Sequence, residues 1–270
     1  MNRYFLTTSV LIPALMSSVG AATIGVKFTD SQDVPFGASV AGAPGYEQGN
    51  WNFMVTDWSG NAGNDTVFSS LVTSTGAPVT ELENVAYPNH SDPVHFDAAN
   101  TWRSGAGNGD ANATLMNGYL DDGTDNQPYV NLSLSSSVTE ATIVLYFNGD
   151  VQNGPVGRYW LEEWTDPLVE GTVITDQVGI SSNGYSGSFV SAGTYGQTGT
   201  PSNVDVSTGN YLVFEGITAN NIRIRGAGNA DPEDFGRGPI NAFQVITVPE
   251  PGTSLMAVLS GLLLVVRRKR

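Results

Sequence analysis

Residues 130–135 read Val-Asn-Leu-Ser-Leu-Ser, and residues 141–147 read Ala-Thr-Ile-Val-Leu-Tyr-Phe. In the first stretch apolar and polar residues alternate, which is typical of a strand with one buried face, because successive side chains of a strand point to opposite faces. In the second stretch both faces are apolar, which predicts a strand in the interior of a sheet. Asn148-Gly149-Asp150 then provides turn chemistry. These stretches predict a domain built on β-sheets.

Similar patterns extend on both sides of this pair. In residues 221–225, alternation places Ile222 and Ile224 inward and Arg223 and Arg225 outward. Residues 111–120 fit one or two helical turns, and residues 70–100 have no clear pattern. The other expected strands cover residues 23–28, 51–55, 158–164, 187–190, 211–215 and 239–246. Roughly ten short strands separated by Gly, Asn and Asp-rich turns predict an all-β, jelly-roll-type β-sandwich.

Three segments resemble the galactose-binding-like sandwiches. They are Asn-Gly-Tyr-Leu-Asp-Asp at 117–122, the Val144-Leu145-Tyr146 strand that ends at Gly149-Asp150, and the closing Pro-Ile-Asn-Ala-Phe-Gln at 239–244. This resemblance implies a fold rather than a function, because such sandwiches carry many functions.

The C-terminal segment, residues 249–270, has the organisation of a sorting signal. Pro249-Glu250-Pro251 is followed by an apolar run from Leu255 to Val266 and then by Arg267, Arg268, Lys269 and Arg270. The twelve apolar residues would form a helix of about 18 Å, whereas a bilayer core is about 30 Å thick. The run therefore predicts a short hydrophobic helix that anchors transiently. The basic end would stay on the cytoplasmic side.

The N-terminal segment, residues 1–22, has the organisation of a secretory signal peptide. Arg3 is the only charge before Lys27, an apolar stretch covers residues 4–16, and small residues follow up to Ala21 and Ala22. This order is that of the three regions of a signal peptide, and cleavage fits after either alanine. The alternative is a buried N-terminal helix of the fold. Residues 23–248 would then form the sandwich domain.

Together the two ends resemble those of the PEP-CTERM proteins, which are exported proteins of Gram-negative bacteria. Pro249, Glu250 and Pro251 match the signature of that family, and the apolar run and basic end match the rest of its tail. The resemblance implies export through signal peptidase and processing near the motif by exosortase, a membrane protease. The product would reside in the cell envelope or outside the cell.

Charge is unevenly distributed along the chain. The two terminal segments hold five of the 11 basic residues and one of the 26 acidic residues, Glu250, so six basic residues remain against 25 acidic ones, a formal charge near −20. Such a surface repels nucleic acids and anionic lipids and suits divalent cations or neutral and cationic polymers. With no cysteine in the chain, disulfides and thiolate chemistry are excluded. We expect no nucleic-acid partner.

Metal ligands are sparse in the sequence. His90 and His95, with Asp92 and Asp97, lack the spacing of a helical zinc site and are better interpreted as loop residues. Asp121, Asp122 and Asp125 lie in an oxygen-rich loop that is either a calcium site or a solvated turn. We expect no obligatory cofactor.

Catalytic groups are not evident either. A glycosidase needs two carboxyl groups that face each other across the sugar. The adjacent residues Glu162 and Glu163 would point to opposite faces of a strand, and nothing marks a cleft near Glu81 and Glu83. The chain is therefore expected not to be an enzyme.

Aromatic residues suggest polysaccharide as a partner. Trp160 and Trp164 share a strand face by parity, and Arg223 and Arg225 alternate outward on another strand, so these four are the candidate glycan contacts. Burial in the core, or a surface salt bridge for the arginines, is the alternative. Three functions follow: an exported non-catalytic surface or matrix protein, which we prefer; a carbohydrate-binding module; and a secreted polysaccharide-active enzyme.

Overall fold

A computed structural model describes residues 21–29, 37–55, 66–67, 70–87, 99–103, 110–122, 128–148, 156–166, 171–181, 185–192, 208–227 and 238–249. Within these ranges the chain is all-β apart from one short helix, α1 (Ala111–Leu115). The strands are β1 (Thr23–Thr29), β2 (Asn52–Val55), β3 (Thr66–Val67), β4 (Leu82–Tyr87), β5 (Ala99–Arg103), β6 (Gly118–Asp122), β7 (Tyr129–Leu134), β8 (Val138–Tyr146), β9 (Val156–Glu163), β10 (Thr172–Ser181), β11 (Thr208–Gly209), β12 (Tyr211–Ile217), β13 (Asn221–Ala227) and β14 (Ala242–Pro249). The predicted all-β class is confirmed for this part of the chain.

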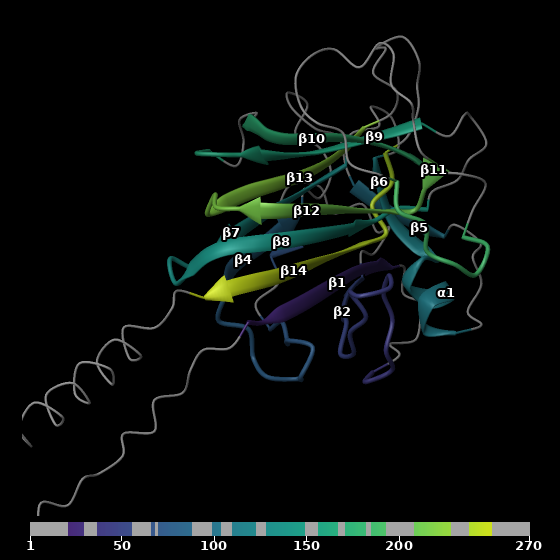
Figure 1. Ribbon diagram of the computed structural model, residues 1–270, viewed down its shortest axis with the longest axis horizontal. Helices are drawn as coiled ribbons and strands as arrows, with labels where there is room; N and C mark the ends of the chain where they lie inside the picture. The colour runs from purple at the N-terminus through teal and green to yellow at the C-terminus, as the bar shows by residue number, and fades with distance from the viewer. Residues whose placement is uncertain are drawn as a thin grey trace, which may run out of the picture.

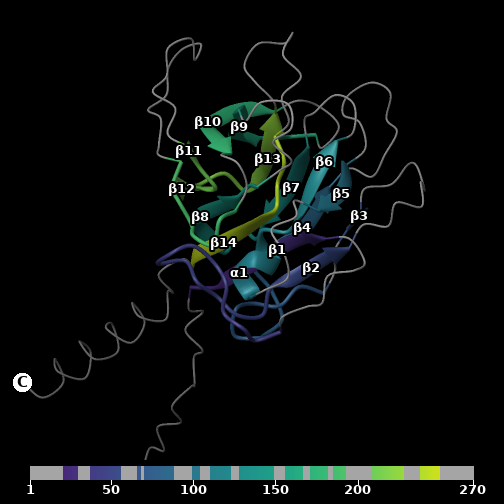
Figure 2. The ribbon, with the colours of Figure 1, turned by 90° about the vertical axis from the view of Figure 1, so that its right-hand side faces the viewer.

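The strands form two main sheets that lie face to face (Figures 1 and 2). One sheet has five strands in the order β12-β8-β14-β1-β2, and the other has seven in the order β11-β10-β9-β13-β7-β4-β3. Neighbours are antiparallel except in the β1–β2 and β10–β11 pairs. A separate hairpin-like pair joins β5 to β6. Strands far apart in sequence are therefore neighbours, as β1 and β14 show in Figure 1.

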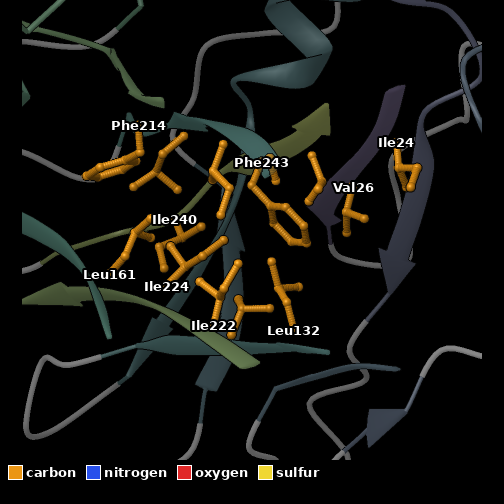
Figure 3. Packing of buried hydrophobic residues seen from close by; sticks show 14 of the residues in the cluster. Ile24, Val26, Leu132, Leu161, Phe214, Ile222, Ile224, Ile240 and Phe243 are labelled. Atoms are coloured by element: carbon orange, nitrogen blue, oxygen red, sulfur yellow. The ribbon is translucent and has the colours of Figure 1, made fainter. Parts of the chain in front are cut away.

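The main core lies between the two sheets. The five-stranded sheet contributes Ile24, Val26 and Phe243, and the seven-stranded sheet contributes Leu132 and Ile222, all with 4% exposure or less (Figure 3). Each fully buried side chain of this size stabilises the fold by roughly 1.5–3 kcal/mol relative to an exposed one. The alternation in the sequence thus supplies one apolar face from each sheet, and burial of these two faces against each other is what holds the sheets together.

Both stretches quoted first form strands, as predicted. Residues 130–135 correspond to β7, whose Val130 and Leu132 are buried, but the prediction of a single buried face was wrong because Asn131 on the other face is buried as well. Residues 141–147 lie mostly in β8, which is flanked by β12 and β14 and buries both Leu145 and Tyr146. The prediction of an interior strand with two buried faces is confirmed.

Other boundaries were wrong. The strand expected at 187–190 is not a strand, and the closing strand expected at 239–246 runs instead from Ala242 to Pro249. The long β10 and the strands within 70–100 were not predicted. Half of the residues of β10 are polar, and Thr175, Asp176 and Gln177 interrupt its apolar residues, so it lacks the regular apolar alternation that marked the other strands.

The first and last strands of the domain lie side by side. β1 pairs antiparallel with β14, and the register places Thr23 opposite Ile246. Just before β1, the Ala22 carbonyl accepts a hydrogen bond of 2.9 Å from the Thr247 N–H. At the other end, Pro249 is the last residue of β14 and lies opposite Val138 of β8. In the described ranges no helix has the length and apolar character needed to cross a bilayer.

Candidate functional site

The outer face of the seven-stranded sheet holds a buried charged cluster, which we call the arginine–glutamate cluster: Glu162, Arg223 and Arg225. The register between β9 and β13 sets Arg223 opposite Glu162. Arg225 Nη1 lies 3.0 Å from Glu162 Oε1, and Arg223 Nη1 lies 3.7 Å from Glu162 Oε2. The three side chains are exposed by 1% or less. One carboxylate therefore serves two guanidinium groups out of contact with solvent.

Neighbouring polar and aromatic side chains complete the cluster. Trp160 Nε1 donates to Glu162 Oε1 at 2.7 Å, and Arg223 Nε donates to the Asn131 side chain at 2.8 Å. The guanidinium carbon of Arg223 lies 4.7 Å from the ring centre of Tyr129, and that of Arg225 lies 5.2 Å from the Trp160 ring. Cation–π contact of this kind is strengthened by desolvation. The cluster is an internal network in which one carboxylate, an amide and two aromatic rings contact the two guanidinium groups.

This arrangement corrects the expected exposure of the arginines. Ile222 and Ile224 do face the core, as predicted, but Arg223 and Arg225 on the opposite face are buried instead of solvated. Trp160 is only 7% exposed, and Trp164 lies beyond the end of β9 and is half-buried. A guanidinium that is paired with a buried carboxylate is not available to sugar hydroxyl groups, so burial argues against Trp160, Arg223 and Arg225 as glycan contacts.

The outer face of the five-stranded sheet is different and carries the candidate site. We call it the aromatic face: the half-buried side chains Tyr46, Tyr185, Phe189 and Tyr211, which pack around buried Tyr146. The ring centres of Tyr185 and Phe189 are 5.4 Å apart, and those of Phe189 and Tyr211 are 6.3 Å apart. Tyr146 lies beneath them, 5.6 Å from Phe189 and 6.4 Å from Tyr211.

Hydrogen bonds hold the buried Tyr146 in place beneath the aromatic face. Its hydroxyl accepts from the Ala43 N–H at 3.1 Å and donates to the Gln244 side chain. Gln244 in turn donates from Nε2 to the Tyr46 carbonyl at 2.7 Å. Burial is the main cause that raises the pKa of Tyr146 well above its ordinary value. The loop that carries Ala43 and Tyr46 is thereby tied to β8 and β14.

Carboxylates surround the half-buried tyrosines. Burial, and then the charge of Glu215, raises the pKa of Tyr46. Burial, and then the charge of Asp110, raises the pKa of Tyr185. Asp110, Glu215 and also Glu47, whose charge acts on Tyr146, are solvent-exposed. The aromatic face therefore combines partly accessible rings with an acidic rim.

The remaining predicted carboxylate pairs are not brought together as catalytic pairs. Glu162 is buried while its neighbour Glu163 is exposed, in agreement with opposite orientation along the strand. Glu81 is 8% exposed and accepts a hydrogen bond from the Thr80 N–H, whereas Glu83 is exposed. The described residues thus offer two separated environments at each pair and no facing carboxyls.

The metal candidates fall largely outside the described residues. Asp121 and Asp122 end β6, where they lie opposite Asn100 and Ala99, while Asp125 lies outside the described ranges. His90, Asp92, His95 and Asp97 also lie outside them. In the part of the chain that the structure describes, no group of three or more His, Asp or Glu side chains is placed to hold a metal ion.

The predicted processing residues are described in part. Ala21 is exposed, Ala22 is buried, and Pro249 lies in β14. Glu250, Pro251, Arg267, Arg268, Lys269 and Arg270 lie outside the described residues. Comparison with known proteins finds no family model that matches the chain and no curated protein that is similar to it.

Proposed function

We propose that the protein is an exported, non-catalytic surface or extracellular-matrix protein that is sorted through its C-terminal tail. Its central domain is a jelly-roll-type sandwich related in form to the galactose-binding-like sandwiches. The tail anchors the chain transiently in the inner membrane, where an exosortase-type protease processes it. Signal peptidase and the export machinery act on the other end.

The observation that carries this proposal is where the sandwich begins and ends. β1 starts at Thr23, directly after the expected cleavage site, and β14 ends at Pro249, the first residue of the Pro-Glu-Pro motif. Removal of residues 1–21 and of the tail beyond the motif would leave every described strand in place. The sheet boundaries thus coincide with the expected processing sites. This agreement supports the proposal that the sandwich stays folded after both ends are removed.

The same contacts favour one of the two cleavage positions. The Thr247 N–H donates to the Ala22 carbonyl at 2.9 Å, and the Ala22 N–H donates to the Thr247 hydroxyl at 3.3 Å. Cleavage after Ala22 would remove both bonds, whereas cleavage after Ala21 keeps the carbonyl bond and leaves Ala22 as a charged N-terminus. We therefore propose Val19-Gly20-Ala21 as the cleavage box.

A structural role for the most enclosed carboxylate supports the non-catalytic assignment. Glu162 is bonded by two arginines and by Trp160, and the Gly171 N–H also donates to it at 3.2 Å. A carboxylate whose two oxygens are engaged in this way by neighbouring side chains and a backbone N–H is not placed to contact the glycosidic oxygen of a sugar, as the acid of a glycosidase must be. The secreted-enzyme alternative thus has no support from this residue.

Cell fractionation tests the sorting proposal. A chain that lacks residues 250–270 keeps all of β14, so the sandwich should fold and appear as soluble exported protein. A matched variant in which Arg267, Arg268, Lys269 and Arg270 are all changed to alanine keeps the apolar run but loses the basic end. We expect membrane retention of the unaltered chain and loss of retention in both variants. Unchanged retention of the shortened chain would overturn the proposal.

A further inference from the structure

We propose that the aromatic face binds an amino-bearing polysaccharide, that is, a sugar chain with free ammonium groups. The inference rests on the proposed function only in that export would bring this face to extracellular polymers. The site comprises Tyr46, Tyr185, Phe189 and Tyr211 with the carboxylates of Asp110 and Glu215. It replaces the glycan contacts that the sequence predicted around Trp160.

The mutual tilt of the rings favours a cation over a flat stacked ligand. The Tyr185 and Phe189 rings are tilted by 53°, and the Phe189 and Tyr211 rings by 86°. Rings at such angles present faces in different directions and do not form one continuous platform. An ammonium group is attracted to an aromatic face within about 6 Å of its centre, and several faces around one cation add to this attraction.

The charges around the rings have the complementary sign. Along β12, Leu212 and Phe214 point into the core and Tyr211 and Val213 lie on the outer face, while Glu215 is an exposed residue in the irregular stretch that follows Phe214. Asp110 caps α1 by accepting from the Ala113 N–H, and the next residue, Ala111, packs against the same cluster as the rings, so this exposed carboxylate lies near the aromatic face. The charges of Asp110 and of exposed Glu215 also raise the pKa of Tyr185 and of Tyr46, respectively. Complementary charge steers a cationic ligand to a site and rejects anionic ones.

The mixed character of the surface favours a sugar chain over a purely charged peptide. Val213 and Ile246 are half-buried and pack against the same cluster as the rings, so they add apolar area to this side of the sheet. A pyranose ring offers an apolar C–H face to such a surface together with hydroxyl groups that can bond tyrosine hydroxyls and carboxylates. Small-ligand sites generally combine apolar contact with a few such polar groups. A glucosamine chain supplies the apolar face, the hydroxyls and the ammonium in each unit.

Four hexamers provide the test in titration calorimetry with the purified protein. They are β-1,4-glucosamine, its N-acetylated counterpart, a galacturonate hexamer and hexalysine. We expect the glucosamine hexamer to bind at least about tenfold more tightly than the acetylated one, with no binding of galacturonate. Equal affinity for the acetylated hexamer would overturn the role of the ammonium. Equal affinity for hexalysine would overturn the assignment to a sugar.

Variants locate the binding. Glu215→Gln and Tyr211→Ala should each weaken glucosamine binding by about tenfold, whereas Tyr211→Phe, which keeps the ring, should weaken it less. Glu163→Gln removes an exposed carboxylate from the other sheet and should change nothing. Wild-type affinity in both Glu215→Gln and Tyr211→Ala would overturn the site. Because binding is measured on purified protein, its failure would leave the fractionation result of the sorting proposal unaffected.

Discussion

The outer faces of the two sheets bear polar and aromatic side chains at equivalent positions of strand alternation, yet they are used in opposite ways. On the seven-stranded sheet, Arg223 and Arg225 are buried around Glu162. On the five-stranded sheet, Tyr211 and Glu215 keep contact with solvent above a buried Tyr146. Alternation decides which residues leave the core, but the contacts made on the far side decide whether they meet water.

The difference has an energetic consequence. Charged groups that are buried together depend on one another, because removal of one leaves the others desolvated. Exposed carboxylates exchange protein neighbours for water at little cost. We therefore expect the arginine–glutamate cluster to govern stability and the rim of the aromatic face to govern recognition.

The largest expected effect comes from loss of the shared carboxylate. Glu162→Gln removes the charge to which both Arg223 and Arg225 are bonded, and it should destabilise the protein by about 3–5 kcal/mol. Urea unfolding followed by tryptophan fluorescence measures the change. Glu163→Gln, one residue along the strand and exposed, is the control and should remain within about 0.5 kcal/mol of the parent. Equal urea midpoints for Glu162→Gln and Glu163→Gln would contradict the expectation that the arginine–glutamate cluster governs stability.

A smaller loss of stability is expected from a change at Tyr146, which lies buried beneath the aromatic face. Tyr146→Phe leaves the ring packing but removes the hydroxyl that bonds the Ala43 N–H and the Gln244 side chain. An unsatisfied buried donor costs about 1–3 kcal/mol. Thermal unfolding is the measurement, and Tyr211→Phe, on the half-buried ring above, is the matched control. A Tyr146→Phe variant as stable as that control would show that these bonds contribute nothing net.

Alkaline pH should lower the stability of the folded protein through the ionisation of Tyr146. The pKa of Tyr146 is raised in the folded protein, chiefly by burial, so the unfolded chain loses this proton first. Stability should be constant below pH 10 and then fall as pH rises, by up to about 1.4 kcal/mol per pH unit from this group. Urea midpoints measured at intervals from pH 8 to about pH 11 should show that fall. Tyr146→Phe should make the fall shallower but not abolish it, because the pKa values of Tyr46 and Tyr185 are also raised, and an unchanged slope in the variant would contradict the assignment.

The smallest effect on stability is expected at the rim. Glu215→Gln alters an exposed carboxylate beside Tyr46 and should change the free energy of unfolding by less than about 0.5 kcal/mol. The same variant is expected to lose ligand affinity, so Glu215 should affect binding with almost no effect on stability. A loss of stability comparable to that of Glu162→Gln would mean that the rim is structural.

The sequence was sufficient to predict which residues lie in the core wherever that depends only on local alternation along a strand. Ile222, Ile224 and Leu132 were placed in the core because strand periodicity alone assigns them to one face. The burial of Arg223 was not predictable in this way, because it requires Glu162 on a strand whose pairing is not visible in one sequence. Alternation could have placed Tyr211 and Val213 on one face, since they flank buried Leu212, whereas the irregularity after Phe214 interrupts alternation before Glu215.

The rest of the aromatic face comes from loops. Tyr46 belongs to a loop that is held by Gln244, and Tyr185 and Phe189 belong to a segment that was expected to contain a strand. Neither position follows from periodicity, because loop placement depends on tertiary hydrogen bonds. The prediction of signals at the two ends has a different basis, because it depends on composition and residue order and requires no tertiary contact.

Intact mass and terminal sequencing of the protein recovered from the envelope and medium test the central claim most directly. We predict a chain that begins at Ala22 and ends near the Pro-Glu-Pro motif, so that the sandwich from β1 to β14 is recovered whole. A full-length chain from Met1 to Arg270, recovered from the cytosol with both ends uncut, would contradict the account.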